Sequence, residues 1–232
     1  MYGVYMSTQA AHRRLNRESV VKAAIELADA DGLESASMRA VAERLGVTPM
    51  ALYKHIANRS QLIDEMLDRV LDAIPVPPSA SDWTDAVRTR IMTTRQQLSR
   101  HPWTRDAIES RPVATASVLA HMDSLMAAMF DGGLSPDLVH HAMHALSTRM
   151  WGFTRDVLPT PTLPVESAER ARAMTAFAET YPSIVRMATT SPHAGVACDD
   201  DAEFAFALDL LLDGIERLHR TGWNRSMKVG SD

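Results

Sequence analysis

A five-residue link, Leu45-Gly46-Val47-Thr48-Pro49, constrains the fold of this chain more than any other stretch. It joins two short segments whose apolar residues recur at the three- and four-residue spacing of a helix. Glycine adopts the left-handed conformation that a tight turn requires, and proline is favoured at the first position of a helix. The link therefore predicts a helix-turn-helix, whose second helix begins at Pro49 behind a Thr48 cap.

Polar caps and apolar repeats predict two more helices around this pair. Asn16 precedes a helix over 17–30, which Asp31-Gly32 ends. Ser37 caps the helix before the link, and Asn58 starts a fourth helix. The fourth helix has an apolar stripe, which consists of Ile63, Met66, Leu67, Val70, Leu71 and Ile74. This stripe is longer than a three-helix domain covers, so we expect the fourth helix to pack on the remainder of the chain as well.

The prolines of Pro75-Val76-Pro77-Pro78 mark a boundary, because closely spaced prolines cannot continue a helix. Beyond them we expect helices at 82–100, 104–110, 113–131, 136–155, 166–179 and 200–220. No segment alternates apolar and polar residues as a half-buried strand does. We therefore expect an all-α chain with a flexible basic arm (1–15), a helix-turn-helix domain (16–60), a connecting helix (61–74), a larger helical body (79–222) and a flexible tail (223–232).

Composition excludes several classes of protein. The single cysteine, Cys198, rules out an intramolecular disulfide and suits a reducing cytoplasm. No apolar run is long enough to cross a membrane, and residues 1–10 lack the apolar core of a secretion signal. Residues 1–59 contain eight Lys or Arg against six Asp or Glu, although the whole chain has a net charge of −5. This asymmetry favours a nucleic-acid-binding face on an acidic body in the cytoplasm.

The start of the third helix is the part that can reach base edges in a DNA major groove. Thr48, Pro49, Met50 and Ala51 lie at its tip, where a hydroxyl and small apolar groups can contact bases. Phosphate contacts are expected from the side chains that follow or flank it, which are Tyr53, Lys54, His55, Arg39 and Arg59. Two arginines of the arm and Arg17 are candidates for the adjacent minor groove or backbone. The alternative is a chance pattern in which Tyr53 fills the domain core.

Three runs of the N-terminal part resemble the tetracycline-repressor (TetR) family of bacterial regulators. They are Ala24–Gly32, Ser37–Val47 and Ala51–Arg59, and Leu52-Tyr53 followed by His55 and Asn58-Arg59 is the most distinctive part. By that resemblance, the residues that fall where family members contact operator DNA are Arg39, Thr48, Tyr53, Lys54, His55 and Arg59. The position after Tyr53 is aromatic in the tetracycline repressors themselves and is Lys54 here, so their base preference does not transfer.

Two helices of the body have apolar residues on more than one face. The helix at 136–155 has an apolar stripe and a second stripe containing His140, His144 and Trp151, and the helix at 200–220 is apolar on nearly all sides. Burial within one subunit or pairing with a second copy would cover them, and the resemblance favours a homodimer built as a four-helix bundle. The expected interface residues are Val139, Met143, Leu146, Met150, Leu208, Leu211, Ile215 and Leu218.

An effector pocket is expected inside the body, lined by apolar and aromatic side chains with a few polar anchors. The candidates are Trp103, His121, Met122, Leu125, Met129, His144, Trp151, Phe153 and Phe177, although most such residues fill a core. His140 and His144 stand one helical turn apart, but no further ligand motif supports a metal, and we expect no metal and no cofactor. The segment from Leu98-Ser99 to Arg111-Pro112 also resembles the tetracycline repressors and places Ala107 where they use a metal-chelating histidine. Magnesium–tetracycline is thus not the expected effector.

The function expected from these features is a homodimeric repressor that leaves a palindromic operator when a small, largely apolar effector binds. The alternatives are a ligand-independent or activating DNA-binding regulator and, more remotely, a helical enzyme that processes small molecules. The sequence contains no phosphate loop, nucleophile elbow or metal triad, which favours the regulators.

Overall fold

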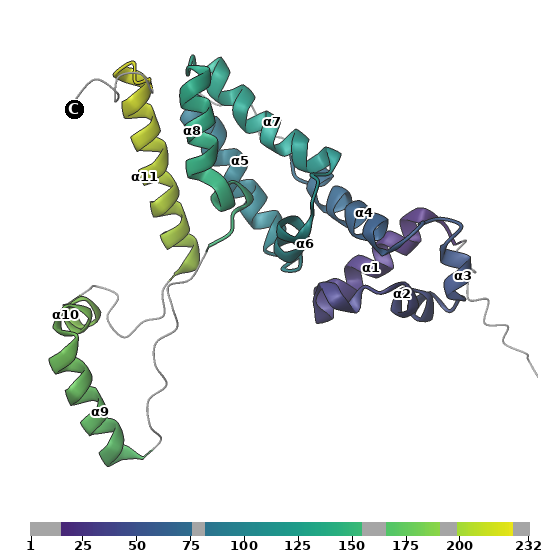
Figure 1. Cartoon of the computed structure of the whole chain (residues 1–232), viewed down its shortest axis with the longest axis horizontal. Helices are drawn as coiled ribbons and strands as arrows, with labels where there is room; N and C mark the ends of the chain where they lie inside the picture. The colour runs from purple at the N-terminus through teal and green to yellow at the C-terminus, as the bar shows by residue number, and fades with distance from the viewer. Residues whose placement is uncertain (1–14, 76–81, 155–165, 191–198, 225–232) are drawn as a thin grey trace, which may run out of the picture.

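The computed structural model describes residues 15–75, 82–154, 166–190 and 199–224, and over these ranges the chain is helical with no strand (Figure 1). The all-α prediction is confirmed. The elements are α1 (Arg17–Asp31), η1 (Leu33–Ser35), α2 (Met38–Leu45), α3 (Pro49–Leu52), α4 (Arg59–Asp72), α5 (Trp83–Leu98), α6 (Thr104–Ser110), α7 (Ala116–Asp131), α8 (Pro136–Leu146), η2 (Ser147–Trp151), α9 (Ser167–Thr180), α10 (Pro182–Thr190) and α11 (Asp200–Arg220). All of the expected arm except Leu15, and most of the boundary segment and the tail, lie outside the described residues.

Helices α1, α2 and α3 form the small domain that the caps predicted. The Asn16 side chain accepts a hydrogen bond from the Ser19 N–H in a capping box, and Ser37 accepts one from the Ala40 N–H at 3.1 Å. Gly46 ends α2 in the left-handed conformation with φ 66°, which the sharp turn to α3 requires. Thr48 precedes α3, but its side chain makes no capping hydrogen bond, which corrects the expected role of its hydroxyl.

Helix α4 joins this domain to the body and is buried against both. It contacts α1 on one side and α5, α6 and α7 on the other, and its stripe from Leu62 to Leu71 is almost fully buried. The expectation that the fourth helix packs on both parts is confirmed. Because its core is continuous with the cores of both domains, α4 is the mechanical link between them (Figure 1).

Helices α5, α7 and α8 form the core of the body, with α6 at the junction to the small domain (Figure 1). The expected single helix over 136–155 is wrong. Helix α8 ends at Leu146, where Ser147 has a φ of 25°, and the chain continues as η2 until Gly152 turns it with a φ of 76°. A Cβ on Gly152 would overlap the Arg95 backbone, so this glycine holds η2 directly against α5.

The last three helices differ in how much of their surface the chain itself covers. Helix α11 contacts α5 and α8, while α9 has no buried residue and stands apart from the bundle together with α10 (Figure 1). Helix α10, which begins at Pro182 one residue after α9 ends, was not predicted from the sequence. Trp223, expected in the flexible tail, is half-buried against the core, and its backbone N–H donates to the Leu218 carbonyl at 3.0 Å.

Candidate nucleic-acid interface and effector site

The outer surface of α2 and α3 presents most of the residues predicted to contact DNA. Leu52 and Ile56 are fully buried and anchor α3, whereas Met50 is 72% exposed and Tyr53 is 48% exposed. Tyr53 therefore does not fill the domain core. Thr48, Pro49, Lys54 and Arg39 are also exposed, and Ala51, His55 and Arg59 are half-buried.

The cations around this surface fall into two groups. Arg59 donates to the Leu33 carbonyl at 3.3 Å and pairs with Glu34 at 3.0 Å, so it holds the start of α4 to η1. Arg17 likewise pairs with Glu65 between α1 and α4. Within the described ranges, by contrast, Arg39 and Lys54 have no ion pair, which leaves their charge available to a phosphate. The two arginines of the arm lie outside the described residues.

Polar contacts fasten the small domain to the start of α6. Asp29 of α1 accepts a hydrogen bond from the Trp103 indole N–H at 2.7 Å and lies 2.8 Å from Nδ1 of His101. Trp103 is 2% exposed. This tryptophan, predicted to line the pocket, therefore connects the two domains.

A second set of contacts fastens α4 to the segment after α6. Arg111 pairs with Asp64 and donates to the Ser60 hydroxyl at 2.7 Å. Ser117, in the first turn of α7, donates to the Asp72 carboxylate at 2.7 Å. Helix α6 is thus flanked at one end by side chains bound to α1 and at the other by side chains bound to α4, and a shift of α6 would be transmitted to both helices.

His121 and Trp151 form a buried aromatic pair inside the body. Their ring centroids lie 4.6 Å apart, and Nε2 of His121 donates to the Met150 carbonyl at 2.8 Å. Burial lowers the pKa of His121 to about 4, with a smaller contribution in the same direction from the positive charge of Arg90 and against the opposing effect of the Met150 hydrogen bond. The imidazole is therefore neutral at neutral pH.

The other predicted pocket residues divide into core, edge and distant positions. Leu125 and Met129 are fully buried in α7, and Met122 and Phe153 are half-buried beside the core. His144 is exposed on α8 and packs against His140 at 4.6 Å between ring centroids. Phe177 lies on α9 and packs on Tyr181. His144 and Phe177 are therefore not brought together with His121 and Trp151.

Most of the residues expected at the dimer interface are buried within the subunit itself. Six of its eight residues are at most 9% exposed within the chain's own core, and these are Val139, Met143, Leu146, Met150, Leu208 and Ile215. Leu211 and Leu218 are half-buried beside them. The apolar residues that α11 exposes instead are Phe206, at 63%, and Leu210, at 58%. In α8 and α11 the more apolar face is the one buried within the subunit. The apolar stripe in the sequence did not show whether it would enter the subunit core or a dimer interface.

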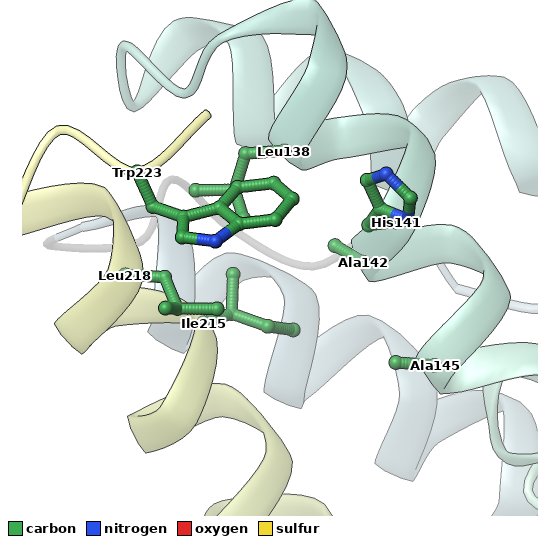
Figure 2. A pocket seen from close by; sticks show the side chains of 7 residues that line it. All are labelled: Leu138, His141, Ala142, Ala145, Ile215, Leu218 and Trp223. Carbon is green, nitrogen blue, oxygen red and sulfur yellow. The ribbon is translucent and has the colours of Figure 1, made fainter. Parts of the chain in front are cut away.

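A hollow of about 400 Å³ lies between α8 and the C-terminal half of α11 (Figure 2). Its lining is almost entirely apolar and consists of Leu138, His141, Ala142, Ala145, Ile215, Leu218 and Trp223. None of these residues was among the predicted pocket residues.

No group of three or more histidine, cysteine or acidic side chains suited to a metal occurs in the described part of the chain. Ala107, which the sequence resemblance aligns with a metal-chelating histidine of the tetracycline repressors, is fully buried. Among the described helices none is long and apolar enough to cross a membrane.

An outward-facing helix-turn-helix fastened to a separate helical body is the arrangement of a DNA-binding regulator. Residues 20–66 match the model for bacterial regulatory proteins of the tetR family, and residues 75–219 match the model for the tetracyclin repressor-like C-terminal domain. The chain belongs to the tetR family of transcriptional regulators. It is 30% identical over 217 residues to the HTH-type transcriptional repressor DrrR1 of Streptomyces coeruleorubidus, covering 88% of this chain and 78% of that protein.

Two further relatives extend the comparison. The tetracycline repressor protein class C of Escherichia coli is 28% identical over 216 residues, covering 90% of this chain and 94% of that protein. The structure of ActR from Streptomyces coelicolor in complex with actinorhodin superimposes with a TM-score of 0.65 and 25% identity, covering 88% and 96% of the two chains. These families and relatives are DNA-binding transcriptional regulators and not enzymes.

Proposed function

We propose that this chain is a homodimeric repressor that binds a two-fold operator and is released from it by a small, largely apolar effector bound in the body. One observation carries the proposal: α4 packs on the DNA-reading domain and on the body at the same time. Any rearrangement of the body core therefore moves the reading helix. The match to the repressor DrrR1 supports repression, and the ActR–actinorhodin complex supports an effector bound in the body. Such a regulator acts in the cytoplasm.

Dimerisation is proposed through the outer faces of α8 and α11. Phe206 and Leu210 are one helical turn apart and exposed, and Gly214, one turn further, has open space where a Cβ would stand. A small residue in line with two large apolar ones lets two helices approach closely. An isologous interface of this kind would set two reading helices one DNA turn apart, about 34–36 Å.

The proposed DNA contacts follow from exposure and charge. Thr48, Pro49, Met50 and Ala51 meet base edges, and Arg39, Tyr53, Lys54 and His55 bind the phosphates. Arg59 contributes by holding α4 to η1, with part of its guanidinium left for a phosphate.

Release is proposed to run through α6. Arg105 of α6 donates to the Thr154 carbonyl at 3.1 Å, just after η2, and the two ends of α6 are bound to α1 and to the connecting helix α4. An effector that displaces η2 therefore displaces α6 and changes the spacing of the two reading helices. The coupling free energy is expected to be about 1–3 kcal/mol.

The test uses an operator selected from random double-stranded DNA with the purified chain. Sedimentation is expected to show a dimer, and a panel of hydrophobic small molecules is expected to contain at least one that weakens operator binding. If no compound alters operator affinity, the alternative of a ligand-independent regulator replaces the proposal. Transcription of a reporter behind the selected operator separates repression from activation.

The Asp29–Trp103 contact provides a matched test of the release path. Asp29→Ala leaves the buried indole N–H without its acceptor, and we expect it to weaken release by the effector while operator affinity without effector stays within about threefold. Asp31→Ala, an exposed acid at the end of the same helix, is the control and is expected to change neither. Equal release from both variants would contradict the α6 path.

A further inference from the structure

Arg90 of α5 is half-buried, and no acidic side chain among the described residues pairs with it. Burial lowers the pKa of its guanidinium, with no opposing contribution from a carboxylate. Its Nε is buried and has no hydrogen-bond partner in the described part of the structure. A buried cation left in this way costs free energy unless a negative charge or hydrogen-bond acceptor compensates it.

Two neighbouring arginines on the same helix show the usual arrangement. Arg88 binds Asp209 at 2.7 Å, and Arg95 binds Asp201 at 2.8 Å, both on α11. They lie on the side of α5 that faces α11. Arg90 instead lies close enough to His121 of α7 for its charge to lower the pKa of that imidazole.

The surroundings of Arg90 combine this cation with an aromatic surface and a second unsatisfied polar atom. His121 is 1% exposed and packs on Trp151, and its Nδ1 is buried with no partner among the described residues. With Nε2 donating to Met150, the neutral imidazole leaves Nδ1 as an acceptor. The same place therefore offers a charged donor, an acceptor and stacked rings.

We propose that the effector site of this chain is built for an aromatic acid, whose anionic group binds the guanidinium of Arg90 while its rings pack beside His121 and Trp151. A donor on the ligand, such as a phenol, would satisfy Nδ1 of His121. This proposal rests on the proposed ligand-responsive function and narrows its effector from a largely apolar compound to one that has an acidic group. The ligand's anion supplies a negative charge that no described residue of the body supplies at Arg90.

The test compares two fluorescent probes that share one ring system. 8-Anilinonaphthalene-1-sulfonate is anionic, and N-phenyl-1-naphthylamine is the same molecule without the sulfonate. For the full-length chain, Arg90→Met is expected to weaken binding of the sulfonate roughly tenfold or more, since a hydrogen bond to a charged group is lost. Binding of the neutral amine is expected to change less than about twofold, because the apolar contacts remain.

Two variants separate charge from structure. Arg90→Lys keeps the positive charge and is expected to retain most of the sulfonate affinity. Arg100→Met makes the same change at an exposed position just beyond α5 and is expected to affect neither probe. Because no described acidic side chain pairs with this half-buried charge, Arg90→Met is also expected to leave the melting temperature of the unliganded protein unchanged or higher. A melting temperature lowered by more than a few degrees would instead show that Arg90 has a structural role.

Three results overturn the proposal: no binding of the sulfonate by the unmodified chain, equal loss of both probes in Arg90→Met, or no loss of either. Operator binding by each variant is measured in parallel and is expected to stay unchanged without ligand. If the Arg90 effect on the sulfonate is present but no ligand ever releases the operator, the acid site stands and the proposed repressor function fails.

Discussion

The DNA-reading domain and the C-terminal part of the body differ in how completely one chain covers its apolar surface. In the reading domain, Leu52 and Ile56 are fully buried, and the large apolar side chains that it exposes, Met50 and Tyr53, lie on the face predicted to contact DNA. In the C-terminal part, α11 exposes Phe206 and Leu210. Helices α9 and α10 add a further exposed apolar set, which consists of Met174, Tyr181, Ile184 and Met187.

This difference corresponds to the two roles proposed above, which are DNA binding by the small domain and regulation of that binding by the body. A domain with its own closed core keeps its reading surface whatever the body does. A body with uncovered apolar helices is suited to association with a second copy, because exposed apolar patches of this kind mark association surfaces. In the proposed dimer, the body would set the position of one reading helix relative to the other.

The largest effect is expected from a charge in the exposed row of α11. Leu210→Asp places a carboxylate where the proposed dimer buries a leucine, so the chain should sediment as a monomer. Operator affinity should then fall by about 100-fold or more, because one reading helix loses the effective concentration that its partner provides. Val113→Asp makes the same change at a residue that is 75% exposed outside α11 and is expected to leave the dimer intact. If the Leu210→Asp protein is still a dimer, the exposed apolar row of α11 is not the dimer interface.

The body core should be sensitive where η2 meets α5. Gly152→Ala introduces a Cβ that overlaps the Arg95 backbone at a residue whose φ is 76°. The loss is expected to be about 3 kcal/mol in the free energy of unfolding, since backbone overlap cannot be relieved by a rotamer change. Urea unfolding followed by circular dichroism measures it. A loss below about 1 kcal/mol would mean that η2 is free to move away from α5.

The buried His121 makes the stability of the body depend on pH. In the unfolded chain this imidazole takes up a proton near its ordinary pKa of 6.5, whereas in the folded chain its pKa is about 4. Between these values the unfolded state binds more protons, so the stabilisation is complete above pH 6.5 and declines as the pH falls to 4. The total loss is roughly 3 kcal/mol. His121→Gln is expected to flatten this slope, and an identical slope in both proteins would contradict the buried neutral imidazole.

The smallest effect is expected in the reading domain. Gly46→Ala keeps the turn between α2 and α3 clear of contacts, because nothing lies within 4 Å of the added Cβ. The cost is then the left-handed conformation alone, about 1 kcal/mol. Thermal unfolding should show a small shift, and operator affinity should remain near that of the unmodified chain. A loss as large as that of Gly152→Ala would remove the contrast between the two glycines.

Local signals predicted the reading domain well, and the limits of the sequence lie in the body. The Asn16 and Ser37 caps and Gly46 act within four residues, so they placed the ends of α1 and α2 to within about one residue. The two apolar faces of α8 and α11 were visible, but which face enters the subunit core depends on packing between distant segments. The stripe at Leu208 and Ile215 was therefore assigned to the dimer and is buried in the chain itself.

The candidate effector site shows the same limit. His121 and Trp151 were named from the sequence and lie together, because both fall on strongly apolar segments. The break at Ser147 that turns Trp151 toward His121 has no sequence signature, since a serine with positive φ is sustained only by its tertiary contacts. Arg90 was not named because its lack of an acidic partner becomes visible only when α5, α7 and α11 are in place.

The symmetry of the protected DNA tests the central claim most directly. Hydroxyl-radical footprinting of the unmodified chain on its selected operator is predicted to give two equivalent protected patches related by a two-fold axis, about one helical turn apart. Addition of a releasing effector should remove both patches together, because one dimer holds both reading helices. A single asymmetric patch, or protection that survives every ligand bound by the body, would contradict the account.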